Sequence, residues 1–171
     1  MISGPWHRLD MMGRSLIPVV VTIFLMLVSQ VPTRLPGFAF VVPALTLMSV
    51  YYWSIHRPDL MRPAVVFGIG LLQDLLSGMP LGMNALTLLL VHGVILSQRQ
   101  FFLANNAFAL LWWAFGLIML GAMAVQWLAF SLLNLYPFPV YAALFQMLLT
   151  LSLFPPFAWF FIRLHRLLLT R

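Results

Sequence analysis

Six apolar runs, separated by short polar breaks, are the feature that most restricts how this chain can fold. The runs cover approximately residues 15–31, 38–55, 62–77, 81–97, 107–132 and 140–162. Only 7% of the 171 residues are charged, whereas a soluble domain has about 25% charged residues. A water-soluble fold could not cover its surface with so few charges. We therefore predict an all-α integral membrane protein, one domain over residues 1–171 with six transmembrane helices.

The arginines predict which way these helices run. All nine cationic residues that give the chain its formal net charge of +6 are arginines. Arg34 follows the first run, while the other eight fall at the opposite ends of the runs: Arg8, Arg14, Arg57, Arg62, Arg99, Arg163, Arg166 and Arg171. Because positive charge concentrates in cytoplasmic loops, we place both termini in the cytoplasm. The same bias explains the net charge, and we expect no nucleic-acid partner, since no basic recognition helix is visible.

Prolines and short lengths shape individual helices. We expect Pro18 in the first turn of the first helix, where a missing N–H costs little. Pro155-Pro156 should kink or locally unwind the sixth helix. The third run spans only about 24 Å as a helix, less than a hydrocarbon core of about 30 Å. We therefore predict a hairpin of the third and fourth helices, its turn at membrane depth and shielded by protein, or a locally thinned bilayer.

Asp74 is the only acidic residue inside an apolar run. A carboxylate in a bilayer costs at least about 2.5 kcal/mol on insertion scales, so a polar partner, a protein-lined interior or protonation must offset that cost. Helix geometry places Asn84 at a similar depth across the hairpin. We predict a polar interior here: either a hydrogen-bonded network that locks the hairpin to the bundle, or a small pocket or partner-docking site. The candidate residues are Gln73, Asp74, Gly78, Pro80, Gly82, Asn84, Gln126 and Gln146.

The sequence shows no catalytic or metal-binding constellation. Asp74 has no second carboxylate nearby for acid–base work, and cysteine is absent. No phosphate-binding loop, zinc-protease motif or nucleophile elbow is present. We interpret His92, within the fourth run, as a structural hydrogen-bonding residue that lies too deep to reach Asp74. We therefore predict no enzymatic activity, no cofactor and no metal.

Residues 70–86 resemble the central hairpin of the bacterial rod shape-determining protein family MreD. The specific part is Gln73-Asp74-Leu75 followed by Gly78-Met79-Pro80-Leu81-Gly82. The preceding stretch fits as well, with Pro43, Tyr51-Tyr52-Trp53-Ser54-Ile55 and Arg57-Pro58. The chain length, the six runs and the basic tail are similar to the family over essentially the whole sequence.

The resemblance implies a non-enzymatic scaffold of the elongasome in the bacterial cytoplasmic (inner) membrane, crossing it several times. Such a scaffold binds MreC and helps to organise lateral peptidoglycan synthesis and rod cell shape. Directly or through MreC it meets the glycosyltransferase RodA, a penicillin-binding transpeptidase and MreB filaments. It also implies a fold similar to the substrate-binding subunits of energy-coupling-factor transporters. The alternative is a membrane subunit that binds or transports a small molecule through the polar interior around Asp74.

Overall fold

The computed structural model describes residues 5–31, 42–104, 108–134 and 140–169. Within these ranges every element is helical and there is no strand, which confirms the predicted all-α class. The six helices are α1 Pro5–Ser29, α2 Leu45–His56, α3 Pro63–Ser77, α4 Met83–Ala104, α5 Phe108–Asn134 and α6 Val140–Leu169.

Three of these helices are long and apolar enough to cross a membrane. The apolar segments are Met83–Phe102 in α4, Ala109–Leu132 in α5 and Ala143–Leu164 in α6. Two shorter apolar helical stretches, Leu16–Ser29 and Pro63–Ser77, belong to α1 and α3.

The first helix begins earlier than the apolar pattern predicts. It starts at Pro5 rather than near residue 15, and proline suits a first helical position because that N–H has no helical acceptor anyway. Pro18 consequently lies inside the helix, so the prediction that it occupies the first turn is wrong. One turn later, the Thr22 hydroxyl donates a 2.6 Å hydrogen bond to the Pro18 carbonyl.

The second helix is short, central and surrounded by others. Every residue from Leu45 to Ile55 is buried, and the helix packs against α1, α4 and α6. It begins at Leu45, not near residue 38, because residues 42–44 are not helical; residues 38–41 lie outside the described ranges. Buried helix ends need partners for their free backbone groups. At this start the Ala44 N–H donates to Thr150 Oγ1 at 3.1 Å.

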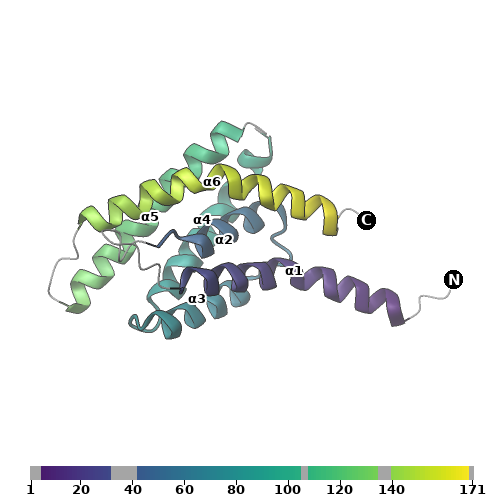
Figure 1. Cartoon of the computed structure of the whole chain (residues 1–171), viewed down its shortest axis with the longest axis horizontal. Coiled ribbons are helices and arrows are strands. Elements are labelled where there is room, and N and C mark those ends of the chain that lie inside the picture. The colour runs from purple at the N-terminus through teal and green to yellow at the C-terminus, as the bar shows by residue number, and fades with distance from the viewer. Residues whose placement is uncertain (1–4, 32–41, 105–107, 135–139, 170–171) are drawn as a thin grey trace.

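The fourth and sixth helices extend past their apolar segments, to Ala104 and Leu169. The polar residues that follow the predicted ends can also adopt a helical conformation. The hydropathy pattern therefore located only the apolar part of each of these two helices. Local unwinding at Pro155-Pro156 does not occur, because α6 is helical through both prolines. Figure 1 shows α6 bowed rather than broken.

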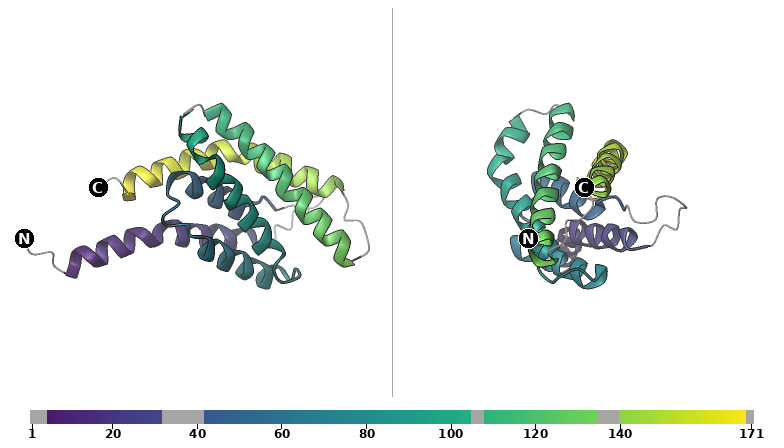
Figure 2. Two further views of the ribbon diagram at one scale, coloured as in Figure 1. Left: turned by 180° about the vertical axis from the view of Figure 1, so that it is seen from behind. Right: turned by 90° about the vertical axis from the view of Figure 1, so that its left-hand side faces the viewer.

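The core gathers around the aromatic residues of α2. The Tyr51 ring meets Phe115 of α5 edge to face at a centroid distance of 5.1 Å, and it meets Phe154 of α6 at 5.8 Å. The Tyr51 hydroxyl donates to the Leu111 carbonyl at 2.9 Å, so its polar atom is satisfied. The ribbon views show the start of α1 and the end of α6 at the same end of the molecule (Figures 1 and 2).

Candidate functional site

The buried carboxylate of Asp74 caps the beginning of the next helix. Asp74 lies in the last turn of α3 and its side chain is 0% exposed. Its Oδ1 accepts from the Asn84 N–H at 2.9 Å. Its Oδ2 accepts from the Gly82 N–H at 2.9 Å and from the Ala85 N–H at 3.4 Å. These donors belong to the start of α4, where backbone N–H groups have no partner within their own helix and favour a negative charge.

The turn between α3 and α4 depends on two glycines. Gly78 ends α3 in the left-handed conformation with φ of 65°, and Gly82 precedes α4 with φ of 98°. Other residues rarely adopt such angles, so glycine is needed at both positions. The Pro80 carbonyl accepts from the Met83 N–H, just after Gly82, at 3.3 Å. The chain therefore reverses within a few residues and brings the α4 start onto Asp74.

The two helices of this hairpin touch through their backbones. A Cβ added at Gly70 would lie 2.3 Å from the Ala85 Cα. A Cβ added at Gly68, half a turn earlier, would meet nothing within 4 Å. Gly70 is one turn before Asp74 in α3, and Ala85 is one of the residues whose N–H the carboxylate binds. The small residues thus hold the α4 start within reach of the cap.

A hydrogen bond between two side chains extends this arrangement to α5. The Gln126 amide Nε2 donates to Asn84 Oδ1 at 2.8 Å. Asn84 is therefore bound to α3 through its backbone and to α5 through its side chain. Asp74, Asn84 and Gln126 form one continuous chain of contacts across three helices.

The remaining candidate residues lie outside this chain of contacts. The Gln146 amide Nε2 donates to the Val42 carbonyl at 2.8 Å, so Gln146 holds the start of α2 instead. Gln73 is half-buried, and its Oε1 is buried without a hydrogen-bond partner in the described part of the protein. Gly78 and Pro80 are exposed at the turn.

Several positions that organise the helices were not visible as a set in the sequence. His92 is 1% exposed, and its Nδ1 lies 2.8 Å from the Ser54 hydroxyl, which agrees with a structural hydrogen bond. Thr150 receives the Ala44 N–H. Both contacts join residues far apart in the chain, so spacing within one helix gives no signal for them. Gly70 carries no polar group, so the composition of α3 gives no sign of its contact with the Ala85 backbone.

The outer surface of the hairpin is apolar up to its tip. The exposed fractions are 67% for Leu75, 48% for Leu76, 41% for Met79, 69% for Leu81 and 51% for Leu86. Turns are rich in glycine, proline, asparagine, aspartate and serine; this one has the glycines and a proline, but its other residues between Ser77 and Asn84 are the apolar Met79, Leu81 and Met83. The hairpin therefore has a polar contact on its inner side, where Asp74 binds the start of α4, and an apolar outer face.

The comparisons with known proteins bear on the same region. The rod shape-determining protein MreD family matches residues 10–164, a range that contains the whole of α2 to α5 and the Asp74 hairpin. Comparison with curated proteins and with solved structures found no match. Since the matched range is most of the 171 residues, the chain belongs to the MreD family of membrane proteins, which determine rod shape.

Proposed function

We propose that this protein is a non-enzymatic scaffold of the machinery that builds lateral peptidoglycan in rod-shaped bacteria. It lies in the inner membrane, crosses it with six helices and keeps both termini in the cytoplasm. Its family membership over residues 10–164 is the observation that carries the proposal.

The distribution of charge supports the orientation. Among the described side chains, Arg57 follows α2, Arg62 precedes α3, and Arg99, Arg163 and Arg166 lie near the ends of α4 and α6. Successive helices run in opposite directions, so these positions all fall at one end of the bundle. Cytoplasmic placement of that end follows from the positive-inside rule.

The α3–α4 hairpin is the surface on which we expect a partner helix to dock. Its outer face is apolar and exposed, with Leu75 and Leu81 the most exposed of its leucines. Its inner side is held by Asp74 and by the Gly70–Ala85 contact, so the face is presented in one geometry. A rigid surface loses little conformational entropy on binding. The membrane helix of MreC is the proposed occupant, and RodA, the penicillin-binding transpeptidase and MreB are reached directly or through MreC.

The polar contacts favour this role over small-molecule transport. Both oxygens of Asp74 accept backbone N–H groups, and Asn84 and Gln126 bind one another. Gln146 serves the start of α2. These groups are engaged in holding helices together, which is what a structural network requires.

Co-purification from the native host in mild detergent tests the proposal. We compare wild type with the hairpin pair Leu75→Ala/Leu81→Ala, whose positions are 67% and 69% exposed. The matched control is Leu117→Ala/Leu132→Ala on α5, at positions that are 73% and 79% exposed. We expect MreC to be recovered with wild type and the control, and recovery to fall severalfold with the hairpin pair at an unchanged melting temperature.

Two results would overturn the proposal. Absence of MreC from the wild-type preparation removes the scaffold role. Equal recovery of MreC with both pairs moves the docking surface away from the hairpin.

A further inference from the structure

The exposed face of α6 changes from apolar to basic within one turn. Phe161 is 1% exposed and stacks on Tyr52 of α2 at a centroid distance of 5.0 Å, which fixes the rotation of this part of the helix. The exposed apolar residues here are Trp159 at 64%, Phe160 at 46% and Ile162 at 37%. Arg163 and Arg166 come next and are exposed as well. This order of apolar, aromatic and basic residues is typical of a helix that passes from the membrane interior to its surface.

Two other helices have exposed polar or charged residues near the same end of the bundle. In α4, exposed Leu96 is followed directly by exposed Ser97 and Gln98. Directly before α3, which runs the opposite way, Arg62 is exposed, and Phe67 is exposed in the second turn of that helix. Phe101, one turn beyond Gln98 in α4, is again apolar and 54% exposed, so α4 mixes polar and apolar residues at this end, and the clear change from apolar to basic belongs to α6.

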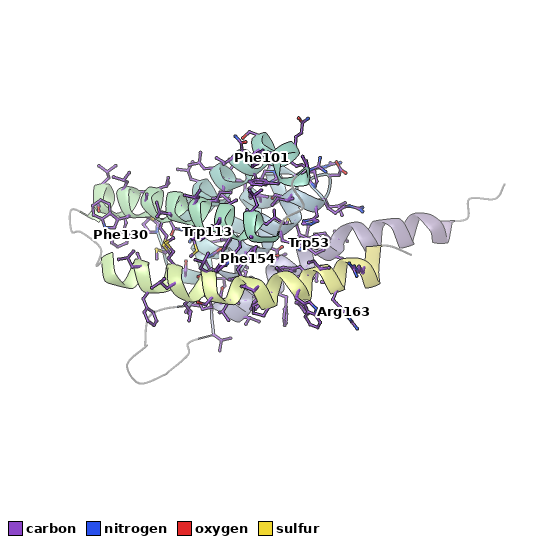
Figure 3. All side chains as sticks on the ribbon, turned by 90° about the horizontal axis from the view of Figure 1, so that it is seen from above. Trp53, Phe101, Trp113, Phe130, Phe154 and Arg163 are labelled. Atoms are coloured by element: carbon purple, nitrogen blue, oxygen red, sulfur yellow. The ribbon has the colours of Figure 1, made fainter. Side chains whose placement is uncertain are left out.

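Arg163 is held at this boundary by an aromatic ring. Its guanidinium carbon lies 5.8 Å from the centre of the Trp159 ring, in range for a cation–π contact. Figure 3 shows the Arg163 side chain directed away from the bundle. Exposed tryptophan settles at the level of lipid head groups. The guanidinium is therefore placed where phosphate groups lie, and its planar donors suit phosphate oxygens.

The charge at this end is strongly one-sided. Among the described side chains, the cations here are Arg57, Arg62, Arg99, Arg163 and Arg166. Of the acids with described side chains, Asp59 lies in the α2–α3 connection and Asp74 is bound to the start of α4 at the other end of the hairpin. This end is therefore complementary to an anionic surface.

We propose that this end of the bundle binds the phosphate head groups of anionic phospholipids, with Arg163 and Arg166 as the main contacts. The inference rests on the membrane placement given under the proposed function, and not on the partner. A lipid fits better than an acidic protein segment, because the arginines directly continue an exposed apolar face. One phospholipid molecule covers that face with its acyl chains and meets the arginines with its phosphate.

Native mass spectrometry of the full chain tests the proposal. The protein is released from detergent in an equimolar mixture of phosphatidylglycerol and phosphatidylcholine with matched acyl chains, and the ratio of the two bound lipids is measured. We expect wild type to prefer phosphatidylglycerol. Neutralising both arginines, as Arg163→Gln/Arg166→Gln, should reduce the preference by about fivefold for each charge removed. The control Gln98→Ala/Gln100→Ala alters exposed polar residues near the same end without changing charge, and should leave the ratio unchanged.

A second variant and a salt series keep the test informative if the double glutamine variant does not fold. Arg163→Lys/Arg166→Lys retains the charges and should retain most of the preference, which should fall as salt is raised because charge contacts at a surface are screened. Equal binding of the two lipids by wild type would overturn the proposal, and an acidic protein segment as occupant would give that result. A preference that survives Arg163→Gln/Arg166→Gln would also overturn it. MreC recovery tests the proposed function separately, so the two can fail independently.

Discussion

The α3–α4 hairpin and the α5–α6 pair are both antiparallel helix pairs, yet they are joined by different kinds of contact. In α3–α4 the main chain itself takes part: Asp74 binds backbone N–H groups, and Gly70 lies against the Ala85 backbone. In α5–α6 the contacts have a side chain on at least one partner: the Phe115 and Phe154 rings stack at 4.4 Å, and the Trp112 indole N–H donates to the Leu151 carbonyl at 3.0 Å. Side chains can change rotamer to absorb a substitution, whereas a backbone contact can relax only if a helix moves. The same kind of substitution should therefore cost more in the first pair.

The largest effect is expected at Asp74. Asp74→Ala leaves the three N–H groups at the start of α4 without their acceptor, and we expect a loss of about 3 kcal/mol in the free energy of unfolding, at about 1 kcal/mol for each hydrogen bond. Asp74→Asn should cost less, because its single amide oxygen can still accept some of these bonds while its NH₂ group faces a donor. Thermal unfolding in detergent measures both variants. Melting temperatures equal to wild type for Asp74→Ala would show that the cap does not stabilise the hairpin.

The next effect compares two glycines of α3. Gly70→Ala forces a methyl group to within 2.3 Å of the Ala85 Cα, and we expect it to cost about 2 kcal/mol as overpacking. Gly68→Ala, which meets nothing within 4 Å, should be neutral or stabilise by up to about 1 kcal/mol through helix propensity. The two variants are measured by the same unfolding assay. Similar melting temperatures would contradict the close backbone contact.

A smaller effect is expected where the hairpin meets α5. Gln126→Ala removes the 2.8 Å hydrogen bond to Asn84 Oδ1, and such contacts in membrane proteins average about 0.6 kcal/mol. A double-mutant cycle with Asn84→Ala isolates the pair. We expect a coupling energy of that size, and additive effects of the two substitutions would show that the pair does not interact.

The smallest effect is expected within α5–α6. A Cβ added at Gly116 would lie 3.4 Å from Leu151 Cδ1, which is the flexible end of a side chain. Gly116→Ala should therefore change stability by no more than about 0.5 kcal/mol, the range of substitutions away from critical features. A loss as large as that of Gly70→Ala would remove the distinction between the two helix pairs.

The sequence was sufficient for the helical class and for the region of interest. Apolar runs located all six helices, and depth along the hairpin placed Asn84 opposite Asp74. The sequence could not indicate which groups donate hydrogen bonds to the Asp74 side chain. The donors are backbone N–H groups rather than polar side chains, and composition does not reveal them because every residue except proline carries one. The four free N–H groups of any helix start are a signal that could have suggested the cap.

The predicted and observed helix ends also differ, because hydropathy shows which residues suit a lipid environment and not where a helix begins or ends. The polar residues before residue 15 continue α1 back to Pro5, and the basic residues after Ile162 continue α6 to Leu169. Depth alone also grouped Gln146 with Asp74, although its contact is with Val42 before α2. Residues at one depth in a six-helix bundle can face different neighbours. Only the rotation of each helix, set by packing of the core, decides which polar groups meet.

Hydrogen–deuterium exchange of the hairpin in lipid nanodiscs tests most directly whether Asp74 holds the start of α4. Wild type and Asp74→Ala are compared in peptides that contain the Gly82, Asn84 and Ala85 amides, with α5 peptides as an internal reference. We predict faster exchange of these amides in the variant and little change in α5. Unchanged exchange at the start of α4 would contradict the cap on which the hairpin is built.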